Sequence, residues 1–166
     1  MPAPLDPGCV FRTLAEHDVR YVLIGGLAAV LHGSPAMTND SDIVPEHGEE
    51  NLARLSGALR SLDARLRADT DPEGIAFDPH PALLAQMVIA NLTTRCGDLD
   101  VAFAPAGIQD YAELADAAVT FEIEGQTVLV AALHHIIRSK EAADRPKDRA
   151  VLPILYALRE EIERDL

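Results

Sequence analysis

Aromatic residues and long apolar runs are both scarce in this chain of 166 residues. Aromatic side chains make up 4% of the sequence and tryptophan is absent, so the core must be built from Leu, Ala, Val and Ile. No apolar run approaches the roughly 20 residues of a membrane span, and residues 1–4 lack the basic and apolar parts of a signal peptide. We therefore expect a cytoplasmic protein with no membrane association.

Cysteine is also rare, and its placement is uninformative about metal or redox chemistry. Cys9 and Cys96 belong to no CxxC pattern and to no Cys/His cluster. In a cytoplasmic protein this isolation favours reduced thiols over a disulfide or a metal site.

Basic residues are fewer than acidic ones: there are 14 Lys and Arg and 27 Asp and Glu, which gives a net charge of −13. This balance argues against non-specific nucleic-acid binding, which depends on neutralising phosphates. The basic residues nevertheless concentrate near the C-terminus, where five fall within twelve positions: Arg138, Lys140, Arg145, Lys147 and Arg149. Such a cluster suits a focused phosphate site, although a solvated helix face would look the same.

What is present fits one globular domain over residues 1–166, since 48% of residues are apolar and 25% are charged. Apolar periodicity predicts helices over 8–17, 27–31, 52–66, 108–117 and 132–143, with a last helix opened by Pro146. Strands are predicted over 20–24, 40–44, 91–95, 98–103, 119–123 and 127–130, with residues 82–90 left open between helix and strand. We expect an α/β (α+β) fold, with a small mixed sheet flanked by helices. Within it, a catalytic core over residues of about 18–131 would precede a C-terminal helical part over about 132–166.

Two carboxylates spaced i, i+2 begin one of these strands, in Asp40-Ser41-Asp42. On a strand, both side chains lie on one face. There they would form a pair of oxygen ligands of the kind that Mg²⁺ takes when it also binds substrate phosphates. Asp-x-Asp alone is weak evidence, because exposed acidic turns often show it. Here it follows an apolar strand, a Gly-Gly turn and His32-Gly33-Ser34-Pro35, which is the layout of a nucleotidyl-transfer site.

A third carboxylate is expected from a neighbouring strand, and Asp98 and Asp100 are the two candidates. Asp100 lies deeper in its apolar run, where a charge is costly unless it is used. Asp98 stands beside a turn and is more easily explained as a solvent-exposed residue. We therefore favour Asp100 as the third metal ligand.

Phosphate-binding groups are also present. Gly33-Ser34 offers a backbone that can approach phosphate closely, with amide and hydroxyl donors. Lys140, Arg145 and Lys147 are candidate cations for a triphosphate. Asp148 would orient Lys140, pair with Arg145, or favour the start of the last helix.

Six segments together define a resemblance that covers most of the chain: Ile24-Gly25-Gly26-Leu27-Ala28, His32-Gly33-Ser34-Pro35, Thr38-Asn39-Asp40-Ser41-Asp42, Gly97-Asp98-Leu99-Asp100, Ile137-Arg138-Ser139-Lys140 and Arg145-Pro146-Lys147-Asp148. In their order and spacing the chain resembles the nucleotidyltransferase-like toxins of bacterial toxin–antitoxin systems, of the AbiEii and MenT type. The resemblance implies a minimal DNA-polymerase-β-like fold and an NTP-dependent nucleotidyltransferase (EC 2.7.7 type).

The resemblance also implies a site and a substrate. The matched positions are Ser34, Asp40, Asp42, Asp100, Lys140 and Asp148, with Mg²⁺ or Mn²⁺ as the cofactor and an NTP as substrate. The implied reaction transfers NMP, often a pyrimidine nucleotide, to the 3′ end of tRNA and so blocks translation.

A cognate antitoxin is the implied protein partner, acting by contact or as a kinase that modifies the hydroxyl of Thr38. One position departs from the pattern, since relatives commonly have Arg where this chain has Ala36. Loss of that cation would weaken triphosphate binding or alter the choice of nucleotide.

Two other functions remain open on the residues alone. The acceptor could instead be a small molecule such as an aminoglycoside, or a protein hydroxyl that becomes AMPylated. The chain could also be a catalytically weak pseudo-enzyme that serves as an antitoxin or regulator, which Ala36 would favour.

Overall fold

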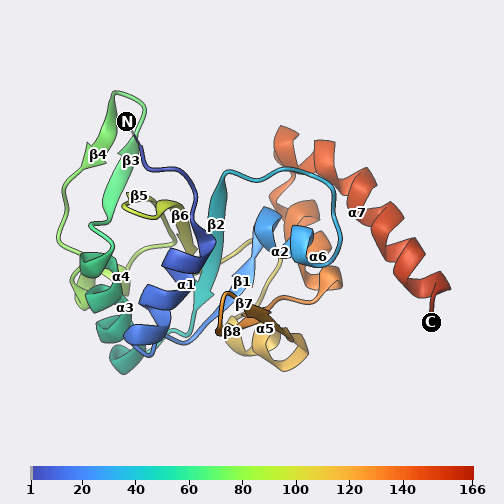
Figure 1. Ribbon diagram of the computed structural model, residues 1–166, viewed down its shortest axis with the longest axis horizontal. Helices are drawn as coiled ribbons and strands as arrows, with labels where there is room; N and C mark the ends of the chain where they lie inside the picture. The colour runs from blue at the N-terminus through green and yellow to red at the C-terminus, as the bar shows by residue number, and fades with distance from the viewer. Residues whose placement is uncertain (1) are drawn as a thin grey trace.

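The computed structural model describes residues 2–166, and in them eight strands form one mixed sheet (Figure 1). The strands are β1 (Tyr21–Ile24), β2 (Asp40–Pro45), β3 (Arg65–Ala68), β4 (Asp71–Ile75), β5 (Ile89–Thr94), β6 (Gly97–Ala102), β7 (Val119–Ile123) and β8 (Gln126–Val130). Their order across the sheet is β4-β3-β5-β6-β2-β1-β8-β7. The β2–β6 and β1–β8 pairs are parallel, and the other neighbours are antiparallel.

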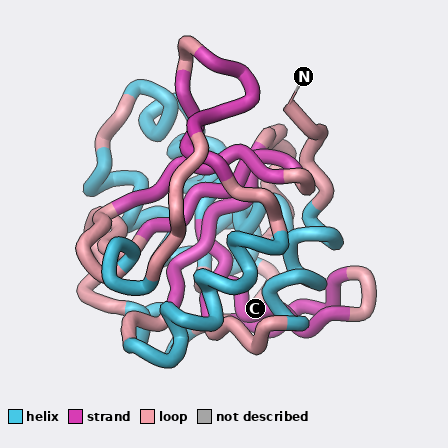
Figure 2. Tube along the Cα trace, turned by 90° about the vertical axis from the view of Figure 1, so that its left-hand side faces the viewer, coloured by secondary structure: helices cyan, strands magenta, loops and turns pink. Residues whose placement is uncertain are grey.

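Helices surround this sheet. They are α1 (Pro7–Glu16), α2 (Gly25–Leu31), α3 (Glu49–Ser61), α4 (Pro81–Leu84), α5 (Tyr111–Ala117), α6 (Leu133–Ala143) and α7 (Pro146–Arg164). The β3–β4 hairpin projects beyond the rest of the sheet (Figures 1 and 2), and the end of α7 extends away from the opposite side (Figure 1). No helix within residues 2–166 is both long enough and apolar enough to cross a bilayer.

The core is aliphatic, as the shortage of aromatic residues predicts. Val22, Leu23 and Ile43 from the central strands are completely buried, together with Leu55 and Leu59 of α3. Val22 and Leu23 lie on β1, and Ile43 lies on β2, the strand that also contains Asp40 and Asp42. The packing therefore fixes the backbone on which the acidic residues stand.

The α/β fold class predicted from the sequence is confirmed, including the two hairpins β5–β6 and β7–β8. The helix expected over 52–66 is wrong in its last turn. It ends at Ser61, and Asp63 takes a left-handed φ of 50° that turns the chain into β3. Leu66 lies on β3, where it pairs with Leu92 of β5. It follows the helical spacing of the leucines before it only by coincidence.

The expectation of reduced thiols is also wrong, because Cys9 and Cys96 form a disulfide. Cys9 lies in the first turn of α1, and Cys96 lies in the turn between β5 and β6. The backbone N–H of Asp6 donates to the carbonyl of Cys96 at 2.9 Å, which holds the start of α1 against that turn. The partners are 87 residues apart, so no local pattern could show that the fold brings them together.

Candidate active site

Three carboxylates meet where β2 and β6 run side by side. Asp40 and Asp42 come from β2 and Asp100 comes from β6, and the parallel register sets Asp42 beside Asp100. Each can offer one oxygen such that all three oxygens lie within 4.8 Å of one another. The structure thus brings together the three residues predicted as metal ligands, and Asp98 is not part of this group.

Burial and the nearby negative charges raise the pKa values of Asp42 and Asp100. Burial raises the pKa of Asp42 to about 8, and the negative charges of Asp40 and Asp100 add to the shift. Burial likewise raises the pKa of Asp100 to about 6, against the opposing charge of Arg67. Holding three carboxylates this close is unfavourable unless a cation compensates them.

The donor set fits a divalent cation such as Mg²⁺ or Mn²⁺, which prefers carboxylate oxygens. Oδ1 of Asp100 is buried, and among the described residues it accepts no hydrogen bond but forms an ion pair. Its nearest cation is Arg67, whose Nη2 lies 3.0 Å away.

Two glycines that sequence reasoning treated only as a turn lie close to the site, Gly25 against Asp42 and Gly26 against Thr38. A β-carbon on Gly25 would lie 2.4 Å from Oδ2 of Asp42, and one on Gly26 would lie 3.0 Å from Oγ1 of Thr38. Gly25 also has a φ of +75°, which favours glycine. Their place depends on the β1–β2 pairing, which sets Ile24 opposite Asp42 and which no local sequence pattern shows.

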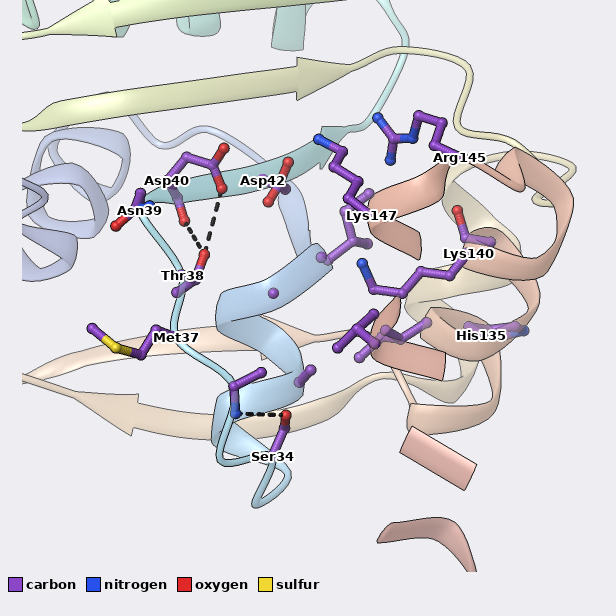
Figure 3. Close-up of a pocket in the computed structure, with 18 of the residues that line it drawn as sticks. Ser34, Met37, Thr38, Asn39, Asp40, Asp42, His135, Lys140, Arg145 and Lys147 are labelled. Atoms are coloured by element: carbon purple, nitrogen blue, oxygen red, sulfur yellow. Dashed lines mark hydrogen bonds between the residues drawn. The ribbon is translucent and has the colours of Figure 1, made fainter. Parts of the chain in front are cut away.

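Gly33 and Ser34, which the sequence suggested for phosphate binding, lie at the opposite end of α2 from Asp42. They follow the C-terminal end of α2, whereas Asp42 lies by its N-terminal end (Figure 3). Ser34 lines the same cleft but is buried, and its Oγ accepts the backbone N–H of Ala36 at 3.3 Å. Gly33 packs toward Leu158 of α7 and does not line the cleft.

Cations line the other side of the cleft. Lys140 comes from α6, Lys147 from the first turn of α7 and Arg145 from the residue that caps α7. Their charged ends point toward the side of the cleft on which Asp42 lies (Figure 3). The structure therefore sets the three cations among the predicted phosphate-binding residues opposite the acids.

Asp148 forms ion pairs with two of these cations, Arg145 and Lys140. It is completely buried, and its Oδ2 lies 2.7 Å from Nε of Arg145. Its Oδ1 lies 3.7 Å from Nζ of Lys140. Asp148 therefore contacts both of the cations that the sequence suggested as its partners. Its carboxylate also accepts the backbone N–H of Arg145 and so caps α7.

The cleft between acids and cations has a volume of about 310 Å³. That volume is at the lower end of the range of small-ligand sites. Its apolar wall comes from Ile24 and Ala29 on one side and from Ile108, Ile136 and Val151 on the other. Ala36 also lines it, with a small side chain that carries no charge.

The loop over 36–39 forms one rim of the cleft and carries Thr38. Thr38 is half-buried, and its hydroxyl donates to the carbonyl of Asp40 at 3.2 Å. The same hydroxyl lies 3.5 Å from Oδ1 of Asp40, so it stands beside the acidic cluster (Figure 3).

No protein-family model and no curated protein sequence matches this chain. Solved structures do match. A candidate nucleotidyltransferase from Thermotoga maritima gives a TM-score of 0.56 at 16% identity, over 94% of this chain and 89% of that one. A nucleotidyltransferase-like protein from Paracoccidioides brasiliensis gives 0.54 at 19% identity, over 94% and 78% of the two chains. The antibiotic-resistance factor ANT(2'')-Ia gives 0.51 at 15% identity, over 95% and 91%.

These likenesses extend over nearly the whole chain, so they concern the complete arrangement of sheet and helices. At such low identities they establish the fold alone. The chain has a nucleotidyltransferase-like fold, as its sequence predicted.

Proposed function

We propose that this protein is a metal-dependent nucleotidyltransferase. The observation that carries the proposal is the opposition of two charge groups across one small cleft. Asp40 and Asp42, with Asp100 beside them, form its acidic side, and Lys140, Arg145 and Lys147 form its basic side. Nucleotidyl transfer needs these two parts, because the triphosphate must be neutralised and the departing pyrophosphate stabilised.

In the proposed reaction, an acceptor hydroxyl oxygen bonds to the α-phosphorus of an NTP. The bond from that phosphorus to the oxygen bridging to the β-phosphate breaks, pyrophosphate leaves with the bonding electrons, and the hydroxyl proton passes to solvent water. Asp40, Asp42 and Asp100 would hold Mg²⁺ or Mn²⁺, which neutralises the phosphates when bound. Lys140, Arg145 and Lys147 would bind the remaining phosphate charge, and Asp148 would keep the first two in place.

For the acceptor, we propose the 3′ end of tRNA and a role as the toxin of a toxin–antitoxin system in the cytoplasm. The support is the resemblance of the six motif segments to such toxins, including Lys140 and Asp148. In this role a cognate antitoxin would be the protein partner, and Thr38, beside Asp40, would be the target of a kinase-type antitoxin.

A small-molecule acceptor is the second candidate, and charge favours it. The net charge of −13 opposes docking of a large polyanion. The tip of the β3–β4 hairpin adds exposed acids at Asp69, Asp71 and Glu73. ANT(2'')-Ia, an antibiotic-resistance factor, shares the fold.

One experiment separates these functions. The purified protein is incubated with Mg²⁺ and each of four α-labelled NTPs, in the presence of total tRNA or of a panel of aminoglycosides. Label on tRNA supports the toxin, label on the small molecule supports the second candidate, and label on protein indicates AMPylation. No transfer to any acceptor would support a pseudo-enzyme and contradict the proposed activity.

The control is a pair of aspartate variants. Asp42→Asn must abolish any signal that arises from this site. Asp78→Asn, at an exposed ion pair with Arg60, should leave the signal unchanged. Equal loss in both variants would show that the signal does not depend on the acidic cluster.

A further inference from the structure

Four carboxylates, rather than three, share the edge where β2 and β6 meet. The parallel register sets Asp40 beside Asp98 and Asp42 beside Asp100. Because Asp98 and Asp100 are two residues apart on one strand, both side chains lie on the same face. Register alone therefore gives two possible partners for the β2 acids, and some other contact must choose between them.

Arg67 contacts both of these β6 acids. It comes from β3, two strands away from β6, and reaches across β5. Its Nε lies 3.2 Å from Oδ2 of Asp98, and its Nη2 lies 3.0 Å from Oδ1 of Asp100. The same Nη2 donates to the carbonyl of Leu92 on β5 at 2.8 Å. One guanidinium thus contacts two carboxylates and is itself tied to the backbone of the strand it crosses.

The consequences for the two acids differ. The side chain of Asp98 is 33% exposed, pairs with Arg67 and stays outside the group of three oxygens. The side chain of Asp100 is 13% exposed and joins that group while Arg67 holds it by Oδ1. A carboxylate has two oxygens, so one contact with Arg67 leaves capacity for a metal ion.

We infer that Arg67 is a positioning residue that selects Asp100 over Asp98 as the third metal ligand and fixes its carboxylate before the ion arrives. This inference rests on the proposed metal-dependent function. Outer contacts to ligating carboxylates commonly affect metal affinity, because they reduce the number of orientations that the ligand can adopt. A planar guanidinium suits this role, since it can hold two carboxylates and a carbonyl in fixed directions.

Direct Mn²⁺ binding tests the inference without any need for the acceptor. Free Mn²⁺ is measured by electron paramagnetic resonance while the metal-free protein is titrated. We expect Arg67→Met to raise the dissociation constant about tenfold or more, a usual effect of losing such a contact. Arg67→Lys should restore part of the affinity, because it keeps a charge but cannot make all three contacts.

Arg65→Met is the matched control. Arg65 lies on the same strand and bonds the backbone carbonyls of Glu73 and Gly74, away from the acids. Its loss should leave the Mn²⁺ dissociation constant unchanged. Thermal unfolding in EDTA will show whether Arg67→Met folds, and the aspartate variants below test the same selection if it does not.

Asp98→Asn and Asp100→Asn test the selection itself. Asp98→Asn should change the dissociation constant by less than about threefold, whereas Asp100→Asn should raise it by more than about tenfold. Equal losses in the two would overturn the inference. So would unchanged or tighter Mn²⁺ binding in Arg67→Met, which would make Arg67 a competitor for the acids.

The wild-type protein separates this inference from the proposed function. If it binds Mn²⁺ and the Arg67 variants behave like it, the inference fails while the metal-dependent function stands. If the wild-type protein binds no Mn²⁺ at millimolar concentration, both are overturned.

Discussion

Oδ2 of Asp42 occupies the space that a side chain on Gly25 would need, at 2.4 Å from the position of the missing β-carbon. This relationship joins two features that are far apart in the sequence, the turn from β1 into α2 and the acidic strand β2. Gly25 therefore determines where the carboxylate of Asp42 can lie.

Gly25→Ala should displace Asp42 and impair metal binding. The new methyl group overlaps a carboxylate, and the φ of +75° strains any residue other than glycine. We expect Mn²⁺ affinity to fall about tenfold or more, and the free energy of unfolding to fall by about 1–2 kcal/mol. Electron paramagnetic resonance and urea unfolding measure the two effects.

Gly125→Ala separates strain from displacement. Gly125 has a similar φ of +82°, but no heavy atom lies within 4 Å of its missing β-carbon. This variant should lose a similar amount of stability and keep its Mn²⁺ affinity. If Gly25→Ala also kept full affinity, the contact with Asp42 would have no functional importance.

The acidic residues could be anticipated because they depend on local rules. Alternation along a strand places Asp40 and Asp42 on one face, and the turn at Gly97 predicts the β5–β6 hairpin that carries Asp100. The choice of Asp100 over Asp98 followed from the cost of burying a charge in an apolar run. In the structure, Asp100 is indeed the more buried of the two.

Local rules could not show which of the glycines lies close to the acidic residues. Gly25-Gly26 and Gly33-Ser34 flank the same helix, and composition does not say which end faces the acids. That depends on the antiparallel pairing of β1 with β2, which is a long-range contact. The reach of Arg67 across β5 is equally invisible to local pattern, since it spans three strands.

The metal-free protein should lose stability as the pH rises from about 4 to about 8. The pKa of Asp42 is raised by burial to about 8 in the folded state, so its protonated form favours folding. That stability is complete below the pKa of an unfolded aspartate and is lost as the pH rises through the folded value. Asp100, with a pKa raised to about 6, contributes in the same direction.

Thermal unfolding midpoints in EDTA between pH 4 and 9 measure this effect, with Asp42→Asn as the control for the general rise in negative charge. The unfolding midpoint of Asp42→Asn should fall less steeply with rising pH than that of the wild-type protein. Added Mg²⁺ should raise the wild-type midpoint most at high pH, because binding requires ionised carboxylates. Identical slopes in the two proteins would contradict the raised pKa of Asp42.

Asp148→Asn should destabilise the protein and loosen both cations. Asp148 is completely buried and pairs with Arg145 and Lys140, so neutralising it removes the compensation of two positive charges. We expect a loss of about 2–4 kcal/mol in urea unfolding, given the partial exposure of Arg145. Asp144→Asn is the control, since its pair with Arg149 is exposed and should contribute less than about 0.5 kcal/mol. Equal effects would contradict the anchoring role.

Reduction of the Cys9–Cys96 disulfide should lower stability by about 2–4 kcal/mol, because the bond closes a long loop in the unfolded chain. Urea unfolding with and without dithiothreitol measures the difference. A Cys9→Ala, Cys96→Ala double variant should be insensitive to the reductant. Two thiols titrating in the untreated native protein would contradict the bond. In the cytoplasm that we propose for this protein, glutathione would set the fraction of the bond that forms.

Thr38→Glu should impair use of the NTP, as phosphorylation of Thr38 would. The hydroxyl lies 3.5 Å from Oδ1 of Asp40, so a phosphate there would add about two negative charges beside the acids and repel the triphosphate. We expect the KM for NTP to rise about tenfold, an effect of roughly 1.4 kcal/mol.

Thr38→Val keeps the shape of the side chain and removes the hydroxyl, so it should leave KM nearly unchanged. An equal rise in KM for both variants would show that the hydroxyl, and not the added charge, matters. The proposed antitoxin mechanism needs its own measurement, mass spectrometry of the protein after co-expression with the product of the neighbouring gene. If transfer activity is lost while Thr38 stays unmodified, the antitoxin acts by contact and the kinase mechanism is wrong.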